Sequence, residues 1–151
     1  MKLFITGAAG FIGSNFARHV LTTSDDEVVV YDALTYAGNR ANLADLEDDP
    51  RFSFVEGNIC DRDAVRAAMT GCDQVVHFAA ESHVDRSLLD PDVFVRTNCD
   101  GTNVLCDIAT QLGIERFVSG APPAVLENER KQKADAEAKI KALEERLAVL
   151  K

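Results

Sequence analysis

The sequence predicts an α/β fold in which a parallel sheet of about five strands carries helices on both faces. Short apolar runs alternate with segments of helical periodicity from the first residues to about residue 120. This alternation requires right-handed crossover connections, which place helices over both faces of a parallel sheet. A proline pair, Pro122 and Pro123, then ends the pattern. We therefore predict one α/β domain over residues 1–120, followed by a long C-terminal amphipathic helix over residues 121–151.

The elements follow from local signals. The strands are expected at residues 2–6, 27–32, 51–57, 73–80 and 115–119, and the helices at residues 11–23, 61–71 and 91–113. The first strand stops at a glycine, as buried parallel strands often do. The helix from Asp61 has an acidic first turn and ends at Gly71, and Pro91 suits the first turn of the long helix.

The C-terminal segment differs in composition from the rest of the chain. Lys2 is the only lysine before residue 119, whereas five lysines follow it. Ile140, Leu143, Leu147 and Leu150 have the spacing of a coiled-coil seam, but the apolar repeat is short for a free-standing coiled coil. This stripe is expected to pack on the parent sheet, to join a second copy, or to form a free-standing coiled coil. A homo-oligomer is predicted, through this helix or through the exposed edge of the sheet.

The composition excludes several classes of partner. A net charge of −9 argues against nucleic acids and anionic membranes, which reward clustered basic residues. The sequence has no apolar run long enough for a membrane span. The four cysteines form no C-x-x-C pair, which indicates reduced thiols and a cytoplasmic location. His83 with Asp85 supplies too few ligands for a metal site, so none is expected.

A glycine-rich turn, "TGAAGFIG" (residues 6–13), separates the first strand from the first helix. Gly7 suits a tight turn, Gly10 a close approach of the backbone to phosphates, and Gly13 close packing of helix on strand. The helix N-terminus adds free N–H groups and the positive end of a dipole. A purely structural turn remains the alternative interpretation.

Asp32 ends the second strand, about twenty residues after the glycines. A carboxylate there accepts hydrogen bonds from an adenosine ribose and repels a 2′-phosphate, which predicts NAD rather than NADP. The alternative is an exposed aspartate at a strand end. Together, the glycine turn and Asp32 favour a Rossmann-like domain.

Longer motifs narrow this prediction. "TGAAGFIGSNFARHVL", "YDALTYAGNRANL", "GNICD" and "VVHFAAESHVDRS" resemble the extended short-chain dehydrogenase superfamily, within it the NAD-dependent nucleotide-sugar dehydratases, and most of all the dTDP-glucose 4,6-dehydratases. The resemblance runs from residue 1 to about residue 118. It implies cofactor contacts at Gly7, Gly10, Phe11, Ile12, Gly13, Asp32, Leu34, Thr35, Ala37, Gly38, Asn58, Ile59, Ala79, Ala80, Ser82 and Thr97. The family more often has aspartate at the position of Asn58, which is a mild departure.

The segment "FAAESHVDRS" (residues 78–87) follows the fourth strand, so it emerges at the carboxyl end of the sheet, where ligands of such folds bind. The resemblance implies that His83 and Arg86, with Asn98 from the next helix, face a nucleotide-sugar. Alternatively, this segment is a surface loop, and Thr97 and Asn98 are polar positions on a partly exposed helix.

Two motifs that the resemblance leads us to expect are missing. The family's fifth strand continues into a Thr-Asp-Glu segment, and a later helix carries Tyr-x-x-x-Lys; neither occurs in this sequence. The leading hypothesis is therefore an NAD-binding fragment or variant without the parent activity. The alternatives are a minimal NAD-dependent enzyme that uses His83, Glu81 or Asp85 as its base, and a non-catalytic scaffold that acts through its C-terminal helix.

Overall fold

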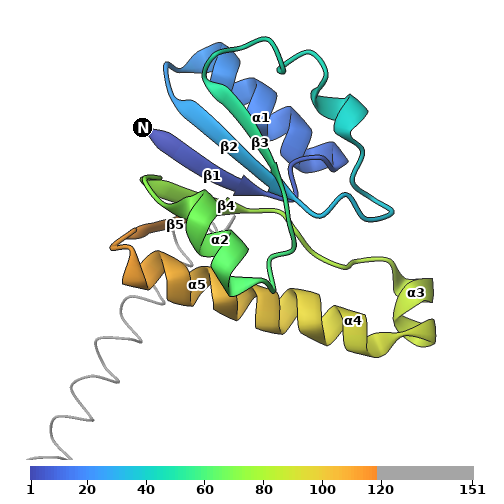
Figure 1. Ribbon diagram of the computed structural model, residues 1–151. Helices are drawn as coiled ribbons and strands as arrows, with labels where there is room; N and C mark the ends of the chain where they lie inside the picture. The colour runs from blue at the N-terminus through green and yellow to red at the C-terminus, as the bar shows by residue number, and fades with distance from the viewer. Residues whose placement is uncertain (119–151) are drawn as a thin grey trace, which may run out of the picture. The chain divides into compact units, whose positions relative to one another are not determined.

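The computed structural model describes residues 1–118 and shows a five-stranded parallel sheet (Figure 1). The strands are β1 (Lys2–Thr6), β2 (Glu27–Asp32), β3 (Phe52–Glu56), β4 (Gln74–His77) and β5 (Arg116–Val118). Their order across the sheet is β3-β2-β1-β4-β5, and all four neighbouring pairs are parallel. The predicted fold class of the described residues is therefore confirmed.

Helical segments connect the strands. They are α1 (Phe11–Thr23), the 3₁₀ turn η1 (Arg40–Leu43), α2 (Arg62–Met69), α3 (Val84–Leu89), α4 (Pro91–Val95), the π-helical segment η2 (Arg96–Gly101) and α5 (Thr102–Gln111). None of the helices in the described part of the chain is both long enough and apolar enough to cross a membrane.

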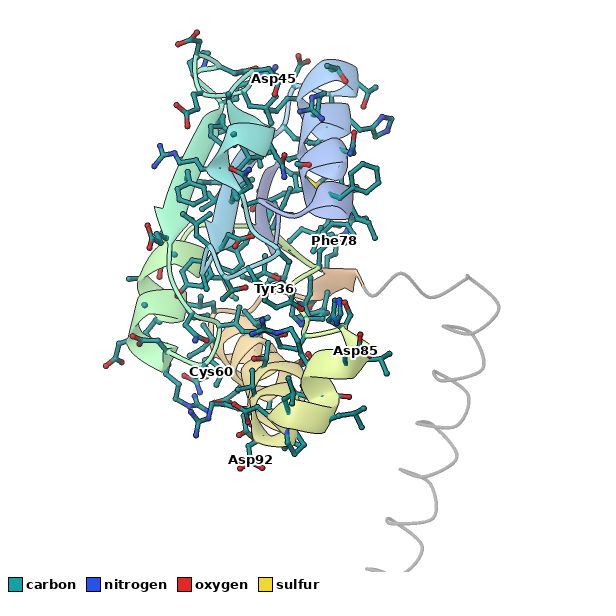
Figure 2. All side chains as sticks on the ribbon, turned by 90° about the vertical axis from the view of Figure 1, so that its right-hand side faces the viewer. Tyr36, Asp45, Cys60, Phe78, Asp85 and Asp92 are labelled. Carbon is teal, nitrogen blue, oxygen red and sulfur yellow. The ribbon has the colours of Figure 1, made fainter. Side chains whose placement is uncertain are left out.

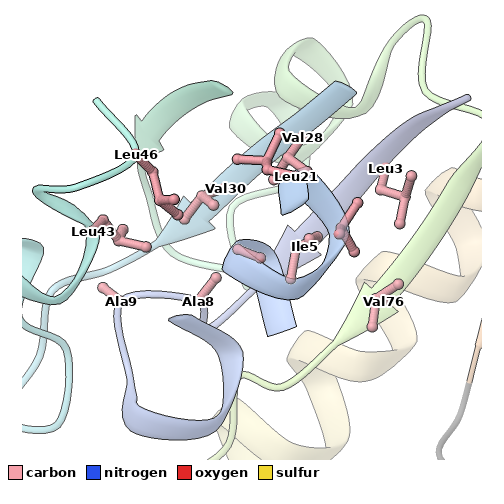
Figure 3. Packing of buried hydrophobic residues seen from close by; sticks show 12 residues of the cluster. Leu3, Ile5, Ala8, Ala9, Leu21, Val28, Val30, Leu43, Leu46 and Val76 are labelled. Carbon is pink, nitrogen blue, oxygen red and sulfur yellow. The ribbon is translucent and has the colours of Figure 1, made fainter. Parts of the chain in front are cut away.

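The core has two layers because side chains alternate between the faces of each strand. On one face, Ile5 of β1 and Val30 of β2 pack with Leu21 of α1, and Figure 3 shows this cluster from close by. On the opposite face, Phe4 belongs to a second cluster with Leu105 of α5, and residues of α2 complete it. Helices thus cover both faces of the central strands, as predicted.

Several boundaries differ from those expected. Strand β4 ends at His77 rather than Ala80, because its register with β1 ends at the pair of Thr6 and His77, and only the N–H of Phe78 still bonds to the carbonyl of Thr6, at 3.0 Å. The long helix expected over residues 91–113 is helical from Pro91 to Gln111 but contains the π-helical segment η2. The segments η1 and α3 were not predicted. The predicted C-terminal helix and the domain boundary at residue 120 lie outside the described residues.

Candidate nucleotide-binding site

A cavity of about 350 Å³ lies where the direction of strand order changes. From β1 the chain builds the sheet outward through β2 and β3, and it then returns to the other side of β1 for β4 and β5. Open α/β sheets bind ligands at this switch point, outside the carboxyl ends of the strands. The cavity lining comes from the residues that follow β1, β2, β3 and β4.

The glycine turn forms the floor of this cavity. Gly7 has a φ of 69°, and a Cβ placed on it would lie 2.4 Å from the backbone nitrogen of Ala79. A Cβ on Gly13 would lie 2.7 Å from Cα of Ala8. These two glycines therefore allow the close contacts that hold the turn against β4 and α1.

Gly10 differs from these two glycines. It is the N-cap of α1 and has an ordinary φ of −78°. Because glycine has no side chain, it makes no capping hydrogen bond to the helix. The nearest atom to a Cβ on Gly10 would be the carbonyl oxygen of Gly7, at 3.2 Å. The first residues of α1, Phe11, Ile12 and Gly13, line the cavity, so the positive end of the helix dipole faces it. No side chain caps this end of the helix. The turn can therefore receive an anion.

Asp32 stands on the β2 side of the cavity and is 8% exposed. Its Oδ2 accepts a hydrogen bond from the backbone N–H of Ala9 at 2.8 Å, and its Oδ1 accepts one from Leu34 at 2.9 Å. Each carboxylate oxygen has two lone pairs, so acceptor capacity is left for a ligand. Gly38 lies against this carboxylate, since a Cβ there would be 2.6 Å from Oδ1.

The next part of the wall comes from the end of β3. The carbonyl oxygen of Asn58 accepts a hydrogen bond from the Tyr31 hydroxyl at 3.1 Å, and its side-chain Oδ1 accepts one from the N–H of Cys60 at 2.9 Å. Burial, with a smaller effect from Asp61, raises the pKa of Tyr31 to about 12. Asn58 and Ile59 thus present a fixed polar and apolar edge to the cavity.

Residues 79–82 form the wall on the β4 side, together with Thr97 of η2. Asn98 fixes this wall: its Oδ1 accepts from the N–H of Glu81, and its Nδ2 donates to the carbonyl of Glu81, both at 2.8 Å. Glu81 is 9% exposed, and its Oε2 is buried without a hydrogen-bond partner in the described structure. Among the described residues, this carboxylate oxygen is therefore buried and unpaired within the wall of the cavity.

Comparison with known proteins identifies the family. The model of the NAD dependent epimerase/dehydratase family matches residues 3–140. The chain belongs to this family. A dTDP-glucose 4,6-dehydratase of Streptomyces griseus is 56% identical over 119 residues, which are 77% of this chain and 36% of the relative. The low-salt glycan biosynthesis protein Agl12 of Haloferax volcanii is 53% identical over 118 residues, which are 78% of this chain and 38% of the relative.

Solved structures agree with these relatives. The dTDP-glucose 4,6-dehydratase DesIV from Streptomyces venezuelae, solved with NAD and TYD bound, matches with a TM-score of 0.74 and 50% identity. The match covers 78% of this chain and 38% of DesIV. This epimerase/dehydratase family member therefore spans little more than a third of the length of the relatives it matches.

The cavity brings together nearly all the residues that the family resemblance assigned to the cofactor. Every one of them lines it except Leu34, which has a φ of 48° and packs against the core cluster beside α1. Four further lining residues had no role predicted, namely Tyr31, Ala33, Gly57 and Phe78, and Glu81, predicted only as a catalytic candidate, also lines the cavity. Gly57 had a recognisable signal, since it follows a strand as Gly7 does. A Cβ on it would lie within 2.3 Å of the Tyr31 hydroxyl oxygen.

Of the residues that the family resemblance assigned to the nucleotide-sugar, Asn98 bonds to the cavity wall at Glu81, whereas His83 and Arg86 do not line this cavity. The Arg86 guanidinium stands 4.0 Å from the ring centroid of Tyr36, and the His83 ring centroid is 6.4 Å from the same ring. Figure 2 labels Tyr36 and, on α3, Asp85. Arg86 lines a second cavity of about 200 Å³, which Glu81 also borders. Asp85 is exposed in the first turn of α3. Within residues 1–118, no group of three or more potential ligands could hold a metal ion.

Proposed function

We propose that this family member binds NAD in the cavity, as an NAD-binding domain of the dTDP-glucose 4,6-dehydratase type. The observation that carries the proposal is the pairing of an uncapped helix N-terminus at Gly10 with the buried carboxylate of Asp32. The first suits a pyrophosphate and the second suits the hydroxyl groups of a ribose. Structures of relatives with NAD bound support the same ligand.

The volume and the lining of the cavity support the same proposal. Its volume of about 350 Å³ falls within the usual range for small-molecule sites. Ile59 offers an apolar surface and Asn58 offers polar groups, which together suit a nucleotide base. Since Asp32 carries a negative charge near the ribose, an added 2′-phosphate would be repelled, and we propose a preference for NAD over NADP.

We further propose that these 151 residues on their own lack the dehydratase activity of their relatives. When bound, NAD would supply an acceptor for the hydride of an alcohol, and that reaction requires a base of the protein that takes the alcohol's proton near neutral pH. The chain has two tyrosines, and neither belongs to a Tyr-x-x-x-Lys motif. The pKa of Tyr31 is raised to about 12, and burial followed by Glu81 raises that of Tyr36. Both shifts oppose the role of a base.

The alternative of a minimal enzyme finds less support. His83 and Asp85 are exposed and do not line the larger cavity. Glu81 does line it, so Glu81 is the one of the three candidates that could touch a bound cofactor.

An Asp32→Asn variant tests the proposal. We expect NAD affinity to fall at least about tenfold, because the ribose hydroxyls lose a charged acceptor. Asp73→Asn is the matched control, since the carboxylate of Asp73 also accepts a backbone hydrogen bond, from Lys2 at 2.7 Å, but lies outside the cavity. Equal NAD affinity in both variants and in wild type would contradict the site. Conversion of dTDP-glucose to its 4-keto-6-deoxy product by the purified chain would contradict the proposed lack of activity.

The C-terminal segment is proposed to mediate self-association through Ile140, Leu143 and Leu147. Sedimentation of the full chain should then show an oligomer. The double variant Leu143→Lys, Leu147→Lys should be a monomer. A wild-type monomer would contradict this part of the proposal.

A further inference from the structure

A chain of hydrogen bonds connects the first strand to the cavity wall, and three of its residues, Thr6, His77 and Thr102, have no role assigned by the sequence motifs or by the proposed site. The Thr6 hydroxyl lies 3.4 Å from the backbone nitrogen of Ala79 and 2.6 Å from Nδ1 of His77. On the other side of the ring, Nε2 of His77 lies 3.1 Å from the hydroxyl of Thr102. That hydroxyl donates to the carbonyl of Asn98 at 2.7 Å.

The direction of each bond follows from its ends. The carbonyl of Asn98 only accepts, so the Thr102 hydroxyl donates to it and accepts from an N–H at Nε2 of His77. At the other end, the N–H of Ala79 only donates, so Thr6 accepts from it and gives its own proton to Nδ1 of His77. The chain is therefore satisfied when His77 is neutral with its proton on Nε2. Burial lowers the pKa of His77, which favours this neutral form.

Both ends of this chain meet the same stretch of the cavity wall. One end is the N–H of Ala79. At the other end, Asn98 holds the N–H and the carbonyl of Glu81 through its side chain. The wall between these two points carries no strand pairing, since β4 ends at His77. Its backbone position therefore depends on the side chains that bond to it.

We propose that Thr6, His77, Thr102 and Asn98 act together as positioning residues that hold residues 79–82 in place for the cofactor. This proposal rests on the proposed function, because it concerns the same cavity. The wall lies on the β4 side of the glycine turn, opposite Asp32 on the β2 side. A dinucleotide that places its adenosine at Asp32 and its pyrophosphate at the turn must extend its second half toward this wall. The positioning residues therefore act on the nicotinamide half and not on the adenosine half.

A pair of isosteric variants separates this role from general stability. Thr102→Val removes the hydroxyl that joins His77 to Asn98. Thr110→Val is the matched control, because its hydroxyl likewise bonds to the carbonyl four residues earlier, Cys106, at 2.8 Å, and lies outside both cavities. NAD and ADP would be titrated into each full-length variant by calorimetry. ADP probes the adenosine half alone.

We expect Thr102→Val to bind NAD about fivefold to tenfold more weakly, the effect of one or two lost hydrogen bonds, and to bind ADP within about twofold of wild type. Thr110→Val should bind both ligands as wild type does. Asn98→Ala, which releases Glu81 directly, should reproduce the selective loss. Equal losses for NAD and ADP, or none for either, would overturn the positioning role.

Hydrogen exchange keeps this test distinct from that of the proposed function. The amide of Glu81 should exchange slowly in wild type and in Thr110→Val, and at least about tenfold faster in Asn98→Ala and Thr102→Val. Unchanged exchange at Glu81 would overturn the inference even if NAD binds. If Glu81 exchanges faster in the two variants but the wild-type protein binds no NAD, the proposed function is refuted, whereas the role of the hydrogen-bond chain in holding residues 79–82 stands.

Discussion

Gly7→Ala and Gly10→Ala change the same turn but should affect different properties. The first should lower the free energy of unfolding, and the second should lower the affinity for NAD. At Gly7, the φ of 69° costs an L-residue about 1–2 kcal/mol. The added Cβ would also lie 2.4 Å from the nitrogen of Ala79, so the ends of β1 and β4 must separate. That separation weakens the bond from the N–H of Phe78 to the carbonyl of Thr6, which is 3.0 Å long. With about 1 kcal/mol for this weakened hydrogen bond added to the backbone strain, we expect a total loss of about 2–3 kcal/mol.

Gly10→Ala should leave the fold nearly unchanged. Its φ of −78° and ψ of 171° suit alanine, and the closest contact, at 3.2 Å, requires only a small shift. We expect the free energy of unfolding to stay within about 1 kcal/mol of wild type. NAD affinity should nevertheless fall at least about tenfold, because the Cβ takes up space beside the N-terminus of α1 that the pyrophosphate needs.

Urea unfolding and calorimetric titration measure the two effects separately. Gly113→Ala is the control for backbone strain, since Gly113 has a φ of 71° but nothing within 4 Å of an added Cβ. Its loss should be only the strain of about 1–2 kcal/mol, so its difference from Gly7→Ala isolates the steric contact. The reasoning is refuted if Gly7→Ala is no less stable than Gly113→Ala, or if Gly10→Ala binds NAD as wild type does.

Two further predictions follow from burial. His77 has a lowered pKa in the folded state because of burial, so the folded protein binds fewer protons than the unfolded one. The free energy of unfolding should therefore fall as the pH drops through the unfolded value of about 6.5, and His77→Gln should flatten that part of the pH profile; an equal slope in both proteins would contradict the cause. Burial also raises the pKa of the Cys72 thiol to about 11, so iodoacetamide at pH 8 should label Cys72 far more slowly than the exposed Cys99. Peptide mass spectrometry gives both rates, and equal labelling in the native protein would show that Cys72 is accessible.

The sequence was a good guide to the sheet and to the turn at its centre. Strand β2, for example, is a continuous apolar run that ends in Asp32, and such a run is buried whatever surrounds it. Gly7 and Gly13 were recognisable because their spacing reflects local backbone geometry. The positive φ of Gly7 and the contact of Gly13 with Ala8 belong to one strand–turn–helix unit, which a local pattern can encode, whereas the contact of Gly7 with Ala79 does not.

Features that depend on distant contacts were missed or misplaced. The π-helical segment η2 occurs where Gly101 packs on Ile59, so closely that a Cβ would lie 2.5 Å from Cδ1. Nothing in the periodicity of residues 91–113 signals that contact. His77 likewise gains its role only from Thr6 and Thr102, which are 71 and 25 residues away.

Calorimetric titration of the full chain with NAD, and in parallel with NADP, tests the central claim most directly. If the glycine turn and Asp32 form the proposed site, NAD binds saturably to one site per chain, and NADP binds at least about tenfold more weakly. Absence of NAD binding by a folded chain, or tighter binding of NADP, would contradict the claim.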